Sequence, residues 1–140
     1  MPLSAPAQDL QSTIDSFAAS VAEVSAAALG TPDGLLITAS DGLERDHADE
    51  LAAVACGLVS IVAGSTNRIW GEDRVELAVA QLSQRVLMVK PCPGGAILAV
   101  VATSKVDIDA AGSAVEVVAQ QVGRLLTPEL CEELQQAQPM

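Results

Sequence analysis

The chain has 140 residues and a formal net charge of −11, from 18 acidic and 7 basic side chains, and half of its residues are hydrophobic although the aromatic ones are only Phe17 and Trp70. This length suits one domain with an aliphatic core, which buries about two thirds of the surface that the unfolded chain exposes. The excess of acid makes nucleic acids and anionic membranes poor partners. A basic protein surface is a natural partner, although acidity alone more often only keeps a small domain soluble.

The first segment, residues 1–9, is predicted to be an N-terminal arm. It has no basic residue followed by a long apolar run, so it does not resemble a secretory signal, and we expect a cytoplasmic protein. Leu10, Ile14, Phe17 and Val21 recur at helical spacing. They predict a first helix over residues 7–21.

Two strands joined by a tight turn are predicted next, over residues 24–29 and 35–40. Their separator contains TPDG, in which Pro32 suits the second position of a turn and Gly34 can adopt a positive φ. A second Asp-Gly pair, Asp41-Gly42, is predicted to end the second strand and to direct the chain into the next element.

A long helix is predicted over residues 46–64, with a length of nearly 30 Å at about 1.5 Å per residue. Asp46 is predicted to cap its amino end, and Asp49 and Glu50 lie in the first turn, where the helix dipole favours acids. The helix is apolar on more than one side, and we assign one stripe to the core, namely Leu51, Val54, Leu58 and Ile61. The other stripe consists of small residues and is predicted to be an interface, since a monomer needs only one: Ala53, Gly57, Ser60 and Gly64.

Three strands are predicted over residues 74–80, 85–90 and 96–103, and the last is apolar on both faces, which is typical of the middle of a sheet. A further helix is predicted to begin near Asp107. The acidic tail, residues 127–140, is predicted to hold a short helix that Thr127 caps and Pro128 begins. The element order is therefore α-β-β-α-β-β-β-α, followed by this tail.

Few residues could carry chemistry. The sequence has no GxxxxGK phosphate loop and no GxGxxG after a strand, so no nucleotide cofactor is expected. His47 is the single histidine, and Cys56, Cys92 and Cys131 are widely spaced without a CxxC pair, which excludes a multi-histidine metal site, a zinc cluster and a disulfide framework. We expect no catalytic residue, no metal and no cofactor.

Cys92 is the one candidate for an enzymatic alternative. It lies between Pro91 and Pro93, in a turn that could expose its thiol. A reactive thiol needs a nearby positive charge to lower its pKa, and Lys90 is the only local candidate.

The acidic residues before and within the long helix do not have the spacing of a calcium loop, so we interpret them as a solvated helix start. They are Asp41, Glu44, Asp46, Asp49 and Glu50.

The longest uncharged stretch, residues 51–67, is shorter than the roughly 20 apolar residues of a membrane span, so membrane insertion is not expected. Trp70 either anchors a partner, since interface hot spots favour Trp, or covers an edge of the core.

These segments resemble the Roadblock/dynein light chain family. The resemblance covers residues 10–126 and is carried by DGLLITASDGLERDHADELAAVACGLVSIVAG, the strand VELAVAQL, and the hairpin of RVLMVK with GAILAVVA. Bacterial members share a pattern of small, apolar and acidic positions that this sequence matches at Asp33, Gly34, Leu35, Leu36, Ser40, Gly42, Leu43, Asp46, Ala48, Leu51, Ala52, Ala55, Gly57 and Leu58.

The resemblance implies an α+β fold with a profilin-like five-stranded antiparallel sheet, the long central helix on one face and the terminal helices on the other. It also implies a homodimer, in which the third strand pairs with its symmetry mate and the central helices pack together. With the small stripe, this adds three strand residues to the expected interface: Val75, Leu77 and Val79.

The resemblance further implies a non-catalytic regulator or scaffold of a small Ras-like GTPase, with a sensor-kinase-like protein as a further partner. The GTPase is expected on the central-helix surface, for which the candidate residues are Arg45, Asp49, Glu50, Arg68 and Trp70. The alternative is a sensory domain of related topology that holds a small ligand between sheet and helix. The polar residues of the strands, Ser25, Thr38 and Gln81, are too scattered to favour such a pocket.

Overall fold

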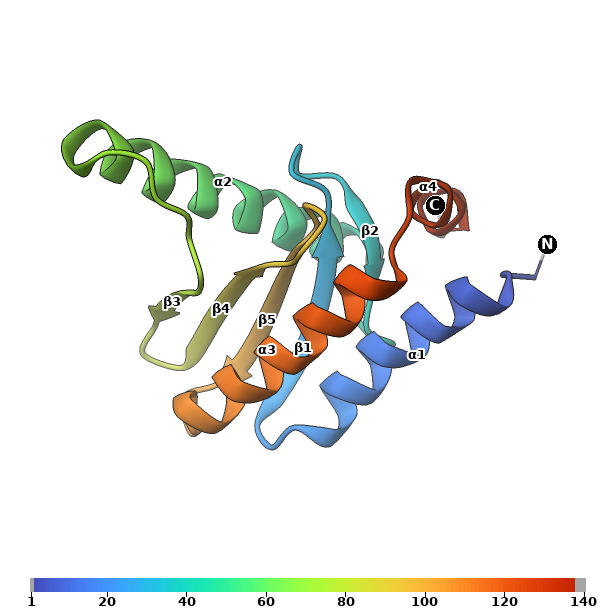
Figure 1. Cartoon of the computed structure of the whole chain (residues 1–140). Coiled ribbons are helices and arrows are strands. Elements are labelled where there is room, and N and C mark those ends of the chain that lie inside the picture. The colour runs from blue at the N-terminus through green and yellow to red at the C-terminus, as the bar shows by residue number, and fades with distance from the viewer. Residues whose placement is uncertain (1, 138–140) are drawn as a thin grey trace.

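Residues 2–137, which the computed structural model describes, form four helices and five strands. The order along the chain is that predicted from the sequence, with the tail helix at the end (Figure 1). The elements are α1 (Ala5–Ser20), β1 (Val24–Gly30), β2 (Leu36–Ala39), α2 (Arg45–Trp70), β3 (Ala78–Gln81), β4 (Arg85–Pro91), β5 (Ile97–Thr103), α3 (Ile108–Leu125) and α4 (Pro128–Ala137).

All strand pairs in the sheet are antiparallel, and the strand order is β2-β1-β5-β4-β3. The strand that the sequence placed in the middle, β5, is indeed central and is buried on both faces over most of its length. The two edges of the sheet are β2 and β3, each only four residues long.

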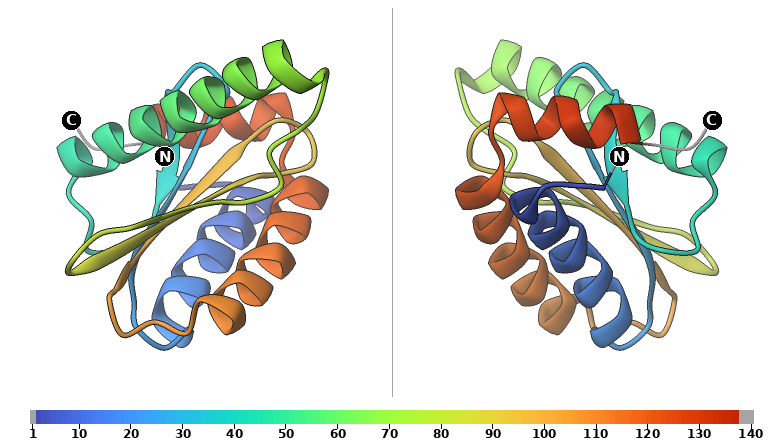
Figure 2. Two further views of the ribbon diagram at one scale, coloured as in Figure 1. Left: turned by 90° about the vertical axis from the view of Figure 1, so that its left-hand side faces the viewer. Right: turned by 90° about the vertical axis from the view of Figure 1, so that its right-hand side faces the viewer.

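The sheet separates two helical layers (Figure 2). The long helix α2 covers one face, and α1 and α3 lie side by side on the other, where α4 also packs against the end of the sheet. The predicted α+β class and the predicted faces of the helices are therefore confirmed.

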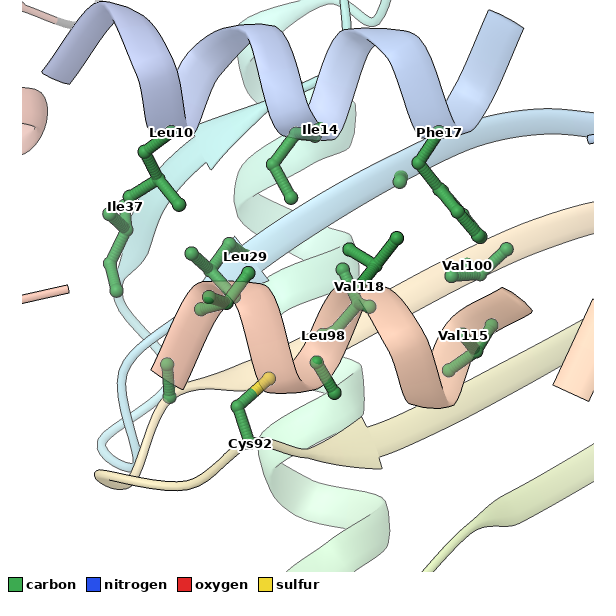
Figure 3. Packing of buried hydrophobic residues seen from close by; sticks show 14 of the residues in the cluster. Leu10, Ile14, Phe17, Leu29, Ile37, Cys92, Leu98, Val100, Val115 and Val118 are labelled. Atoms are coloured by element: carbon green, nitrogen blue, oxygen red, sulfur yellow. The ribbon is translucent and has the colours of Figure 1, made fainter. Parts of the chain in front are cut away.

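The larger core lies between the sheet and the layer of α1, α3 and α4, and it is aliphatic except for Phe17 (Figure 3). Leu10, Ile14 and Phe17 point from α1 toward the sheet, as their spacing predicts. From the other elements, the core takes Leu29, Ile37, Leu98, Val100, Val115 and Val118, among others.

Cys92 belongs to this core and is not the exposed thiol that the sequence suggested. Its side chain lies under α3 (Figure 3), and its Sγ is 3.7 Å from the carbonyl oxygen of Lys90. Burial raises the pKa of the Cys92 thiol to about 12, and the charge of Lys90 offsets only part of this effect. A group that stays protonated at neutral pH is a poor nucleophile.

Alanines form the closest packing contacts between α2 and the sheet. Ala48, Ala52 and Ala55 are the buried residues of this helix. The helix approaches so closely that a Cβ added to Gly30 of β1 would lie 3.1 Å from the Cβ of Ala52. The core stripe proposed from the sequence is wrong at two positions, because Val54 is 53% exposed and Ile61 is 69% exposed.

Both ends of α2 also differ from the prediction. The helix begins at Arg45 with Glu44 as N-cap, so Asp46 lies within the first turn and does not cap it. It continues past Gly64 to Trp70 and ends at Gly71, whose φ is +91°. Its 26 residues give a length of about 39 Å. No proline or positive-φ position interrupts the sequence before Gly71, and this explains the extra length.

The third strand is shorter than expected. β3 spans Ala78–Gln81, whereas the sequence indicated residues 74–80. After α2 ends beyond the sheet, residues 71–77 must return to the sheet edge, and they cannot pair with β4 while they cross this distance. Val75 and Leu77 therefore lie in a connection that precedes the strand.

The remaining local predictions agree closely with the structure. Gly34 turns the first hairpin with φ +87°, and Gly42 follows β2 with φ +92°. Asp107 caps α3 by accepting a hydrogen bond from the Ala110 N–H, and Thr127 caps α4. At the amino end, α1 begins at Ala5, so residues 5–9 of the expected arm are helical. Residues 138–140 of the predicted tail lie outside the described residues.

The close seat of α2 predicts a strong response to added volume at Ala52. Ala52→Leu should lower the free energy of unfolding by about 1–3 kcal/mol, because the larger side chain must push α2 away from Gly30. Urea denaturation followed by circular dichroism measures the change. Ala19→Leu, at an exposed position of α1, is the control and should leave the unfolding midpoint nearly unchanged. Equal effects of the two substitutions would contradict the close packing of Ala52 against Gly30.

The burial of Cys92 predicts protection from alkylation. In the folded protein at pH 8, iodoacetamide should label Cys92 far more slowly than the half-buried Cys56, because the raised pKa leaves almost no thiolate. Guanidinium should abolish the difference. Peptide mass spectrometry of both samples checks this, and rapid labelling of Cys92 in the folded chain would show that its thiol is accessible.

Candidate interaction surface on the central helix

The central helix is longer than the sheet beneath it. Its buried residues, Ala48, Ala52 and Ala55, all lie in the amino-terminal half. The carboxyl-terminal half extends past β3, the edge strand, as the left side of Figure 1 shows. After Leu58 and Val59, which still pack against the cluster of Val89, Ile97 and Ala99, this half extends beyond the sheet.

The overhanging half of α2 exposes large apolar side chains. Ile61, Ile69 and Trp70 are 69%, 66% and 77% exposed, and Val62 is also exposed. The exposure of Trp70 removes the interpretation that it covers the core. At 100° per residue, Val62 and Ile69 lie toward the same side of the helix as the buried alanines, so they continue the sheet-facing stripe where no sheet is present.

A groove runs under this half of the helix. It has a volume of about 550 Å³ and lies between the α2 residues Leu58, Val62, Ala63, Thr66 and Asn67 and residues 73–80, which include β3. Its walls are mostly apolar, and it is open toward the free edge of the sheet. An apolar groove of this size suits contact with another protein segment.

The edge strand β3 presents unpaired backbone groups along this groove. The Leu82 N–H donates to the Arg85 carbonyl oxygen at 2.8 Å, and the register pairs Ala80 with Leu87. Since hydrogen bonding alternates along an antiparallel ladder, the N–H and C=O of Val79 point away from β4. An open edge of this kind is a template for a further strand.

The predicted small stripe lies on the outer side of α2, opposite the sheet. Ala53, Ser60 and Gly64 are exposed and Gly57 is half-buried. A Cβ added at Gly57 or Gly64 would meet no atom within 4 Å, so neither glycine is required by the packing of this chain. The structure thus places the stripe where a partner could reach it. Whether a partner does so stays a prediction.

The three strand residues of the expected interface lie in two environments. Val75 lines the groove beside α2 and is half-buried. Leu77 and Val79 are about 40% exposed, and the Leu77 side chain reaches α3, where it lies near Gly112. They surround the open edge but do not form one apolar face.

The residues predicted to bind a GTPase fall into two separate groups at opposite ends of α2. At the amino end, the Arg45 Nε is 3.0 Å from the Asp49 carboxylate, so these side chains pair with each other, and Glu50 is exposed beside them. At the carboxyl end, Arg68 and Trp70 are exposed. About 20 residues of helix separate the groups, which is roughly 30 Å.

Lys90 is a structural residue that sequence reasoning considered only as a neighbour of Cys92. It is buried on β4, and its Nζ lies 2.6 Å from a Glu116 carboxylate oxygen on α3 and 3.6 Å from one of Glu76. The hydrogen bond with Glu116 raises the pKa of Lys90, despite the opposing effect of burial. Lys90 therefore joins β4 to α3 through Glu116 and adds a weaker attraction to the connection before β3 through the exposed Glu76. Because its partners are 14 and 26 residues away, local sequence gives no signal of this role.

The structure offers little support for a small-ligand pocket between sheet and helix. The alanines of α2 pack against β1 and β2 and against β4 and β5, so the amino-terminal half of the helix leaves no room for a ligand over the sheet. Within residues 2–137, no three His, Cys, Asp or Glu side chains are grouped so that they could hold a metal ion. His47 is exposed in the first turn of α2.

The apolar character of α2 also satisfies the length and composition of a membrane-crossing helix. Its most apolar 18 residues have a mean hydropathy of 1.5, and 17% of them are buried. Among the described residues it is the one helix with this property. The same helix is seated on a sheet through Ala48, Ala52 and Ala55, as an element of a folded domain is.

Comparison with known proteins agrees with this architecture. The sequence model of the Roadblock/LC7 domain matches residues 10–102. A Roadblock/LC7 domain from Streptomyces avermitilis is 28% identical, with a TM-score of 0.74, and the match covers 80% of this chain and 92% of that one. Comparison with curated proteins finds no significant relative.

Two further solved structures share the fold at lower identity. A structure of MglB with a tetrameric arrangement is 17% identical with a TM-score of 0.77, and the match covers 96% of each chain. Profilin II from Acanthamoeba castellanii is also 17% identical, with a TM-score of 0.59, and the match covers 82% of this chain and 97% of that one. The profilin-like fold is thus confirmed, and the match of the family over residues 10–102 shows that the chain belongs to the Roadblock/LC7 domain family.

Proposed function

We propose that this chain is a cytoplasmic, homodimeric regulator or scaffold that binds a small Ras-like GTPase through the surface of α2. Membership of the Roadblock/LC7 family supports a regulatory role and not a catalytic one. A sensor-kinase-like protein is the further partner that the family resemblance implies. The two parts of the proposal, the dimer and the GTPase, rest on different observations and are tested separately.

The overhang of α2 beyond the open edge of β3 is the observation that supports the dimer. A second copy, related by a two-fold axis, would pair its β3 with this edge and continue the sheet beneath the overhang. The added strand would satisfy the outward backbone groups of Val79 and fill the groove beside Leu58 and Val62. One contact therefore accounts for both the exposed apolar stripe and the unpaired edge.

The same two-fold axis would place the overhanging halves of the two central helices next to each other. Large side chains, Val54 and Ile61, alternate along α2 with positions that lack side-chain bulk, Gly57 and Gly64. In an antiparallel pair, such a surface can pack projections of one helix into gaps of the other. The small stripe then allows close approach, while the neighbouring large residues supply most of the buried apolar area.

The exposed ends of α2 support the binding of a second protein. The amino end carries Asp46 and Glu50 in an acidic chain, and this favours a basic surface on the partner. The carboxyl end carries Trp70, a residue type that is enriched among interface hot spots. A dimer would present two copies of each end.

The dimer predicts a solution mass of twice the 14.3 kDa of the chain. Size-exclusion chromatography with light scattering at micromolar concentration measures it. Val79→Pro should give monomers, because it removes an N–H that faces the open edge and leaves the pairing with β4 intact. Ile61→Glu should also give monomers, and Gly57→Leu and Gly64→Leu should weaken the dimer by overfilling the helix contact.

Val117→Glu is the matched control, since Val117 is 57% exposed on α3, far from β3 and α2. It should leave the mass unchanged. A wild-type monomer would contradict the dimer. If Gly57→Leu leaves the dimer intact while Ile61→Glu disrupts it, the small stripe lies outside the contact. Sedimentation of wild-type monomer with neutral phospholipid vesicles would instead make α2 a lipid-binding surface.

Binding to a GTPase is tested with small Ras-like GTPases from the same organism, each immobilised in its GDP form or with a non-hydrolysable GTP analogue. The dimer should bind one form more tightly. Trp70→Ala should weaken that affinity by about tenfold or more, as expected for a hot spot, and Glu50→Lys should mainly slow association, because it reverses the charge at the acidic end.

Light scattering must show that both variants remain dimers, so that a loss of affinity reports the GTPase contact itself. Val117→Ala is the control and should bind as the wild type does. A folded dimer that binds neither nucleotide form would overturn this part of the proposal and leave the dimer standing.

A further inference from the structure

The second edge of the sheet, β2, differs from β3 in being covered. Helix α4 lies beside α1 at this end of the sheet and contacts β2 (Figure 1). Leu130 and Leu134 of α4 are buried in the same apolar cluster as Leu10 and Ile37. The tail helix is thus part of the core at the β2 end.

Side chains from α1 also engage the edge of β2. The Gln11 Nε2 donates to the Ala39 carbonyl oxygen at 2.9 Å, and the Gln11 Oε1 accepts from the Thr38 hydroxyl. The Ser40 N–H bonds to Ala27 of β1, so by alternation the backbone groups of Ala39 point away from β1. Gln11 therefore occupies a carbonyl that an added strand would use, and a strand added after release of α4 would displace this single side chain.

A carboxylate of α4 accepts hydrogen bonds from the residue that caps the amino end of α1. Ser4 is the N-cap of α1, but the residue three positions later is Ala7, so α1 lacks the acid of a capping box. Glu133 of α4 supplies it: the Ser4 N–H donates to Glu133 Oε2 at 2.7 Å, and the Ser4 hydroxyl donates to Oε1 at 2.8 Å. These bonds lower the pKa of Glu133, so it is ionised at neutral pH. Both residues lie outside the region 10–102 matched by the family.

We propose that α4 covers the β2 edge reversibly, and that its release lets the β2 strands of two copies pair. This inference rests on the proposed dimer. A dimer built through β3 has a β2 edge at each end. If these edges were also open, dimers could join β2 to β2 and form an open chain of continuous sheet. The docked α4 stops assembly at two copies.

A second copy is the occupant that fits the uncovered site. Antiparallel pairing about a two-fold axis is self-complementary, so β2 needs no other partner sequence. Release of α4 would expose the apolar surface around Leu10 and Ile37, now covered by Leu130 and Leu134, and association would bury it again. Helix α4 is held by Leu130 and Leu134, by the partly buried Cys131 and by the carboxylate contact of Glu133, and a ten-residue helix has little stability without such tertiary contacts.

The test uses the full chain with Leu134→Asp, which places a charge in the site that α4 occupies. Light scattering should show species larger than the wild-type assembly, growing with concentration. Hydrogen exchange should show faster exchange in residues 128–137. If α4 of the Leu134→Asp chain exchanges freely but the mass stays that of the wild type, α4 does not prevent pairing at β2 and the proposal is overturned.

Unfolding of the variant is distinguished from edge pairing by a second change. Ala39→Pro removes an outward N–H of β2 and blocks strand addition. The double variant Leu134→Asp/Ala39→Pro should return to the wild-type mass, whereas aggregation through unfolding would persist and would contradict the proposal.

Two milder variants test the contact between Glu133 and Ser4. Glu133→Gln should speed exchange at both α4 and the first turn of α1, because it weakens the contact with Ser4. Glu132→Gln is the matched control on the same helix and should change neither; equal behaviour of the two would overturn the role of Glu133. If the wild type is a monomer, the proposed dimer fails, and Leu134→Asp should then convert monomers into dimers through β2.

Discussion

The close contact between the alanines of α2 and the sheet determines where the rest of this molecule can interact. Ala48 and Ala52 pack against β1 and β2, and Ala55 packs against β4 and β5, because none of them has a side chain large enough to hold the helix away. The large apolar residues of α2, such as Ile61 and Ile69, are therefore not used in the fold and remain on the surface. The interaction surface is a consequence of the way the helix is seated.

The two edges of the sheet differ, because β2 is covered and β3 is open. This difference limits which edge can pair with another strand. At β2, Gln11 and α4 cover the strand. At β3, the edge is open and lies beneath a helix whose apolar stripe continues over empty space. A sheet with one covered and one open edge can pair once and then has no further edge to offer. Such an asymmetry suits a closed dimer better than a filament.

The sequence predicted the features that depend on neighbouring residues. Gly34 and Thr127 act in a turn and a cap that involve only a few positions, and their roles were predicted correctly, whereas Asp46 was wrongly predicted to cap α2. The stripes of α2 were harder, because periodicity shows that a helix has two apolar sides but not which one meets the sheet. Of the large residues assigned to the core by hydrophobicity, Leu51 and Leu58 pack against it and are partly buried, whereas Val54 and Ile61 are exposed. The fully buried residues of the helix are alanines. Contacts such as Ser4 with Glu133, 129 positions apart, leave no local pattern.

The open edge also depends on charge. The connection before β3 does not pair with β4, and its contacts with α3 come from Leu77, near Gly112, and from the attraction of Glu76 to Lys90, which is bound to Glu116 of α3. Glu116 is closer and is the main partner, while Glu76 is largely exposed and adds a weaker attraction. A buried lysine with this partner remains charged, as the raised pKa indicates. The edge strand is held by its pairing with β4, and these contacts of the connection lie on the α3 side, so the outward backbone groups of β3 remain available to a second strand.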